Sequence, residues 1–205
     1  MKTTLLKNTF LLAAAGLILS SAAQAAVYHV SINTSTLSTT GNGPFYLDFQ
    51  LNGGDTPSNN SATISNFNFG GGSAVDGTQT TIGSASGNIG STLTLTNTSA
   101  FTEFFQEFVP GSFLKFDLTV TQNLDSITPD LFAFSILDKD LFAIDTTDDF
   151  DSLITFNFDT AGPLNVTTSQ GQGVYSGVTL AIPEPSTGLL GLLVGGLMIV
   201  RRRRA

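Results

Sequence analysis

His29 is the only residue of this chain that could act as an imidazole base. A Ser-His-Asp triad would need that histidine beside a serine nucleophile and an orienting aspartate. The chain contains no Gly-x-Ser-x-Gly elbow, the turn that presents a nucleophilic serine in many hydrolases. We therefore interpret His29 as a polar strand residue. The sequence predicts no catalytic residue and no enzymatic activity.

A cluster of aspartates between residues 138 and 151 offers a second kind of chemistry. Calcium binds several carboxylate oxygens, so such a cluster could form a surface calcium site. The spacing is not that of an EF-hand, because Phe142 and Ala143 occupy positions where a ligand and the turn glycine should stand. A solvated acidic loop without a metal is the other interpretation. The candidates are Asp138, Asp140, Asp145, Asp148, Asp149 and Asp151.

Two further ligand chemistries follow from residue types alone. Paired carboxylates hydrolyse glycosides, but their separation in space cannot be read from a sequence. Tyr28, Tyr46 and Tyr175 could stack on sugar rings and line a carbohydrate-binding face, although the chain has no tryptophan.

Composition excludes several classes of protein. The chain has 205 residues, no cysteine and a single histidine, which rules out disulfides, thiolate metal sites and sites built from several imidazoles. Its 8 Lys+Arg against 16 Asp+Glu give a net charge of −8. Nucleic-acid binding needs clustered basic residues, so no nucleic-acid partner is predicted.

The central region predicts strands that would hold these side chains. Residues 45–51, 114–120, 154–158 and 174–182 alternate apolar and polar residues, which is typical of strands with one buried face. Further strands are expected at 27–32, 62–69, 92–96 and 131–137, the last apolar on both faces as in a central strand. Glycine- and proline-rich turns separate these segments. The pattern predicts an all-β ectodomain, a β-sandwich or jelly roll, over residues 26–182.

Two segments complicate this assignment. Ile64 and Phe67 cannot share one face of a strand without a β-bulge near Asn66. Phe101, Phe104, Phe105 and Phe108 fall at helical spacing, which predicts a helix in the core, with a buried strand as the alternative.

The N-terminal segment has the features of a secretory signal peptide over residues 1–25. Lys2 and Lys7 precede an apolar stretch, and Ala23 and Ala25 provide the small residues of a cleavage site. The distribution of charge also favours export of residues 26–182. This stretch contains only two lysines against fifteen acidic residues, whereas the other basic residues lie in the two terminal segments.

The C-terminal segment, residues 183–205, combines three elements in order. Pro183, Glu184 and Pro185 come first, then a short glycine-rich apolar run that predicts a transmembrane helix. The chain closes with a cluster of arginines that would stay in the cytoplasm and stop transfer: Arg201, Arg202, Arg203 and Arg204. An ordinary membrane anchor is the alternative to a processed signal.

These three elements resemble the PEP-CTERM sorting signal of Gram-negative bacteria, and the strands at residues 27–35, 47–52, 62–67 and 113–120 resemble an uncharacterised β-rich subfamily of such proteins. The resemblance implies that the tail holds the protein in the inner membrane until an exosortase processes it near the Pro-Glu-Pro motif. The product would then reach the cell surface or the extracellular matrix.

Three functions remain open at this point. The first is an exported, non-enzymatic surface or matrix protein associated with exopolysaccharide and biofilm. The second is a carbohydrate-binding β-sandwich, with calcium as its only candidate cofactor. The third is a glycosidase or other hydrolase, which would need two carboxylates opposed across a cleft.

Overall fold

The computed structural model describes residues 26–54, 60–121, 129–144, 146–147, 151–158, 164–171 and 174–181. The predicted signal peptide with Ala23 and Ala25, and the predicted sorting signal with its Pro-Glu-Pro motif and arginine cluster, lie outside these residues. Within the described ranges, no helix has the length and apolar character needed to cross a membrane.

The described chain is all-β, with only a short 3-10 helix, η1 (Leu37–Thr39). The longer strands, of seven to nine residues, are β1 (Ala26–Asn33), β2 (Phe45–Asn52), β3 (Ser61–Asn68), β8 (Phe101–Val109), β9 (Phe113–Val120), β10 (Leu131–Leu137) and β14 (Val174–Ala181). The shorter strands are β4 (Ser73–Ala74), β5 (Thr80–Ile82), β6 (Ala85–Gly87), β7 (Leu93–Thr96), β11 (Ile154–Asn157), β12 (Asn165–Thr168) and β13 (Gln170–Gly171). The prediction of an all-β fold is confirmed.

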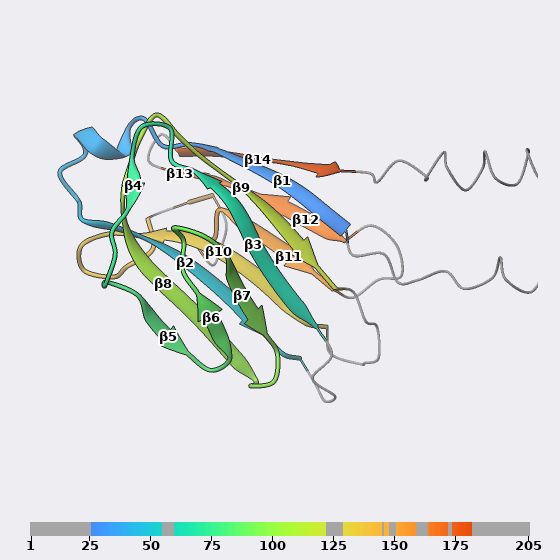
Figure 1. Ribbon diagram of the computed structural model, residues 1–205. Coiled ribbons are helices and arrows are strands. Elements are labelled where there is room, and N and C mark those ends of the chain that lie inside the picture. Colours follow the sequence, from blue (N-terminus) through green and yellow to red (C-terminus); the bar gives the residue numbers. More distant parts are fainter. Residues whose placement is uncertain are drawn as a thin grey trace, which may run out of the picture.

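The strands form two antiparallel sheets that lie one above the other (Figure 1). The first sheet has the order β13-β14-β1-β9-β3-β7-β6. The second has the order β12-β11-β10-β2-β8-β4, with β5 also paired to β8. The chain crosses from one sheet to the other several times, so residues far apart in sequence become neighbours. This arrangement is consistent with a β-sandwich.

Phenylalanine rings pack together with Leu, Ile and Val side chains in the space between the two sheets. Phe49 of the second sheet is fully buried, and its ring centroid lies 5.6 Å from that of Phe116 in the first sheet and 4.9 Å from that of Phe134. Edge-on and tilted ring pairs at such distances stabilise a core beyond the effect of buried area alone. Strand alternation therefore directs one face of each sheet inward and leaves the other available for function.

The strand predictions are confirmed for the longer elements other than β8. Strand β10 lies between β11 and β2, and its apolar residues are buried on both faces, as expected of a central strand. The predicted bulge is present as well. The register of β3 against β9 shifts between Ser65 and Asn68, and Asn66 has a positive φ of 55°.

The predicted helix over the phenylalanines of residues 101–108 is wrong, because the segment is strand β8. It pairs with β2 along eight residues, from Phe45 opposite Phe108 to Asn52 opposite Phe101. Phe104 and Phe108 point into the core, whereas Phe101 is exposed on the outer face. Pairing with β2 on one edge and with β4 and β5 on the other outweighs the helical spacing, since backbone N–H and C=O groups on both edges of β8 gain partners there. The strand places Glu103 on the outer face, beside β2.

Candidate functional site

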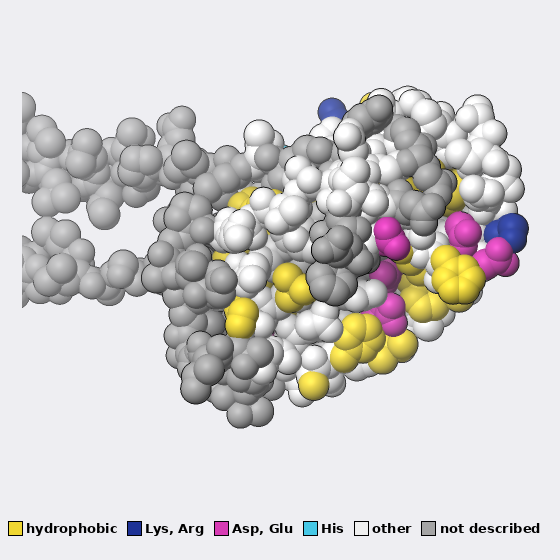
Figure 2. Space-filling view, turned by 180° about the vertical axis from the view of Figure 1, so that it is seen from behind, with side chains coloured by type: hydrophobic (Ala, Val, Ile, Leu, Met, Phe, Trp, Pro, Cys, Tyr) yellow, Lys and Arg dark blue, Asp and Glu magenta, His cyan; other side chains and the backbone are white. Residues whose placement is uncertain are grey.

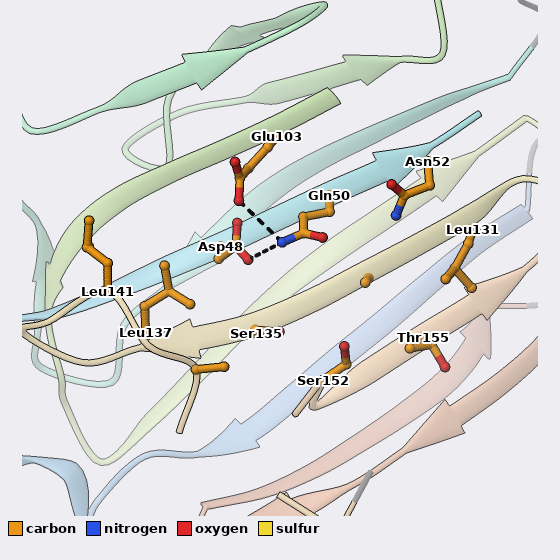
Figure 3. Close-up of a pocket in the computed structure, with 12 residues that line it drawn as sticks. Asp48, Gln50, Asn52, Glu103, Leu131, Ser135, Leu137, Leu141, Ser152 and Thr155 are labelled. Carbon is orange, nitrogen blue, oxygen red and sulfur yellow. Dashed lines mark hydrogen bonds between the residues drawn. The ribbon is translucent and has the colours of Figure 1, made fainter. Parts of the chain in front are cut away.

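The outer face of the second sheet carries a hollow of about 400 Å³ that we call the outer hollow (Figure 3). Its floor comes from strands that are adjacent in space, since Gln50 of β2 is opposite Glu103 of β8 and Ala133 of β10. Carboxyl, amide, hydroxyl and small apolar groups line it. The lining residues are Asp48, Gln50, Asn52, Glu103, Leu131, Ala133, Ser135, Leu137, Leu141, Ala143, Ser152 and Thr155.

Two carboxyl groups and one amide form the polar centre of the outer hollow. The Gln50 side chain donates from Nε2 to Asp48 Oδ2 at 2.8 Å and to Glu103 Oε1 at 3.3 Å. Figure 3 shows the Asp48 and Glu103 carboxyl groups pointing toward one another from neighbouring strands. Asp48 is only 2% exposed, and its Oδ1 atom is buried without a hydrogen-bond partner.

Burial raises the pKa of the Asp48 carboxyl to about 7. The charge of Glu103 and the contact between the two carboxyl groups add to this increase, while the hydrogen bond from Gln50 opposes it. Near neutral pH the Asp48 carboxyl is therefore partly protonated and partly anionic. Such a pair accepts hydrogen bonds strongly and attracts a donor that brings positive charge.

Exposed hydrophobic side chains accompany this polar centre. Leu141, which lines the outer hollow, is 47% exposed, and its neighbour Phe142 is 73% exposed. Phe101 of β8 is 39% exposed on the same face of the second sheet. Figure 2 shows acidic side chains lying among hydrophobic ones on one face of the molecule. A site of this composition suits a ligand that has both apolar surface and polar groups.

His29 lies on the outer face of the other sheet, away from the outer hollow. Its Nδ1 atom is 2.6 Å from Asp117 Oδ1, and Asn66 Nδ2 donates to Asp117 Oδ2 at 2.8 Å. Partial burial pushes the pKa of Asp117 upward, but the hydrogen bonds from Asn66 and His29 outweigh this effect and leave the pKa lowered. Among the described residues, no serine hydroxyl contacts the His29 ring.

The acidic loop is only partly described, since Asp145, Asp148 and Asp149 lie outside the described residues. Asp138 Oδ1 accepts the backbone N–H groups of Asp140 and Phe142, at 2.9 and 3.1 Å. Asp140 forms an ion pair with Lys139, and Asp151 Oδ1 accepts the Thr146 N–H at 3.1 Å. No group of three His, Asp or Glu side chains that could hold a metal occurs in the described part of the chain.

Tyr28 and Tyr46 do not share a face. Tyr28 is buried in the core, with its ring 4.8 Å from that of Phe156, so the prediction that it lines a sugar-binding face is wrong. Tyr46 is half-buried on the outer face of the second sheet, in edge-on contact with Phe105 at 6.1 Å. The side chain of Tyr175 lies outside the described part of the structure.

Sequence reasoning missed the pairing of Asp48 with Glu103. The alternation of residues 45–51 correctly predicts Asp48 on the polar face of its strand, but the helical spacing of the phenylalanines predicts Glu103 on a helix. Residues 102–108 give no clear strand signal, because Thr102 and Gln106 are polar on the buried face and Phe105 is apolar on the outer face.

Comparisons of the chain with protein-family models, with curated proteins and with solved structures find no match. The PEP-CTERM resemblance of residues 183–205 therefore remains a prediction from those residues.

Proposed function

We propose that this chain is an exported, non-enzymatic surface or extracellular-matrix protein that binds exopolysaccharide through the outer hollow. The observation that carries the proposal is the composition of that hollow. Carboxyl, amide and hydroxyl groups from four strands and their connections converge there, beside the exposed side chains of Leu141 and Phe142. A saccharide has hydroxyl groups that can hydrogen-bond to the polar groups of the hollow and apolar ring faces that can pack against Leu141 and Phe142.

The arrangement of the carboxyl groups supports binding rather than hydrolysis. A glycosidase holds its two carboxylates on opposite sides of the bond that it cleaves, at least about 5 Å apart. Asp48 and Glu103 instead lie side by side on neighbouring strands and share the amide of Gln50. Asp48 is also almost fully buried, which leaves its carboxyl group little exposed to a sugar ring.

The proposed function also includes export and sorting of the chain. The signal peptide over residues 1–25 would direct the chain across the inner membrane. An exosortase would then process the tail near Pro183, Glu184 and Pro185, after transient anchoring by the apolar run and the arginine cluster. The exported protein would reach the cell surface or the biofilm matrix, where the outer hollow meets polysaccharide.

A glycan array tests the binding half of this proposal. The full chain is purified in a polyoxyethylene detergent, whose head group is not a sugar, and applied with two matched variants. Thr155→Phe places a large ring in the outer hollow, whereas Thr119→Phe makes the same change on the outer face of the first sheet. We expect the wild type and Thr119→Phe to bind the same saccharides and Thr155→Phe to lose them.

Denaturation curves of the three proteins establish that both variants are folded. Equal binding by Thr155→Phe and Thr119→Phe, or no saccharide binding by the wild type, would contradict the proposed site.

A further inference from the structure

We propose that the outer hollow recognises a protonated amine of its saccharide, so that the polysaccharide contains hexosamine units with free amino groups. This inference rests on the proposed function and names the class of ligand. An ammonium group brings several N–H donors and one positive charge to a single point. Asp48 and Glu103 offer the complementary acceptors at the centre of the hollow.

The charge balance of the outer hollow is the first argument. Asp48 and Glu103 both line it, and no lysine, arginine or histidine lines it with them. The two described lysines lie elsewhere: Lys139 pairs with Asp140, and Lys115 lies over the ring of Phe113 on the first sheet. The described part of the chain therefore supplies no cation to neutralise the two carboxyl groups.

The hydrogen bonding of Asp48 is the second argument. The Gln50 amide donates to Oδ2 of Asp48, but Oδ1 is buried and, while both carboxyl groups are charged, no donor hydrogen-bonds to it. An unpaired buried acceptor is costly, and a charged donor that reaches it recovers more free energy than a neutral one. Glu103 is only half-buried, so its side chain can turn outward and admit the amine beside Asp48.

Calcium is the competing cation, and the hollow suits it less well. Calcium takes six to eight oxygen ligands and favours several carboxylates. Only two carboxyl groups meet in the hollow, and no third acidic side chain joins them among the described residues. An ammonium group needs fewer acceptors and matches the two that are present.

Matched pairs of glycans provide the test. The full chain in polyoxyethylene detergent is titrated with glucosamine oligosaccharides and with the same oligosaccharides after N-acetylation, at about pH 6.5, where an amine with a pKa near 8 stays protonated. We expect the free-amine form to bind at least about tenfold more tightly, as a hydrogen bond to a charged group implies. Glu103→Gln should reduce this preference to less than about threefold.

Glu107→Gln is the matched control, because it removes the same charge from the same face of β8 outside the outer hollow. This variant should retain the preference, which separates local recognition from general attraction of a cation to an acidic protein. Binding that requires calcium and disappears with a chelator would overturn the inference in favour of a metal site. Equal binding of free and acetylated forms would overturn the inference and leave the proposed function standing. No binding of any saccharide would overturn both.

Discussion

The carboxyl groups of Asp48 and Glu103 face one another from neighbouring strands β2 and β8, and the amide of Gln50 donates to both. Two acidic side chains in this position oppose folding when both are charged, because burial and mutual repulsion destabilise the anions. The outer face of the second sheet thus contains a carboxyl pair that would be stabilised by protonation or by a bound cationic ligand.

Asp48→Asn should change the pH dependence of stability. The pKa of Asp48 rises from its ordinary value of 3.8 to about 7 on folding, so the folded state binds more protons than the unfolded state between these values. The wild-type free energy of unfolding should therefore fall as pH increases through that window, by at most about 4 kcal/mol. Urea denaturation from about pH 4 to about pH 8 should show the stability of Asp48→Asn increasing relative to that of the wild type. A difference that stays constant with pH would contradict the account.

Asn66→Ala should destabilise the chain more than Asn66→Gly does. Asn66 has a φ of 55° in the bulge of β3, a conformation that costs alanine roughly 1 kcal/mol and glycine little. Both variants lose the hydrogen bond to Asp117, so their difference isolates the backbone effect. Chemical denaturation of the two variants measures it, and equal midpoints would show that the bulge does not require the left-handed conformation.

Phe142→Ala should weaken saccharide binding without affecting stability. The side chain is 73% exposed next to two residues that line the outer hollow, so its removal creates no core cavity. Its loss should reduce affinity about tenfold if the ring covers a sugar face. Phe49→Ala, which removes a fully buried ring, should by contrast cost about 3–5 kcal/mol. Denaturation and saccharide titration of both variants test this contrast. Unchanged affinity of Phe142→Ala would show that the Phe142 ring does not contribute to saccharide binding.

Deletion of residues 183–205 should change where the protein is found. On the proposed sorting role, a chain without the apolar run and the arginine cluster would not be held in the inner membrane for processing. Cell fractionation of the native host should show loss of the membrane-bound precursor and a different final distribution. Replacement of Pro183, Glu184 and Pro185 by alanine should leave the precursor in the membrane unprocessed. The same distribution with and without the tail would contradict the sorting proposal.

Much of the fold could be predicted from alternation alone, and the site could not. Strand β9 buries every second residue, and β2 does so apart from the additional burial of Asp48, so both strands show apolar–polar alternation in the sequence. Short strands such as β5 and β6 bury almost nothing and leave no pattern. Strand β8 carries phenylalanines on both faces, because Phe101 and Phe105 belong to the outer surface, and this produced the apparent helical spacing. The Asp48–Glu103 pair depends on which strands are neighbours, which alternation does not encode.

The most direct test of the central claim is to locate the bound saccharide by NMR. The full chain, isotopically labelled and held in polyoxyethylene detergent, is titrated with a glycan that it binds on the array. Binding in the outer hollow predicts the largest amide shift changes at Gln50, Glu103, Ser135 and Thr155, with strands β1 and β9 of the first sheet unaffected. Shift changes centred on β1 and β9, or none in strands β2, β8 and β10, would contradict the account.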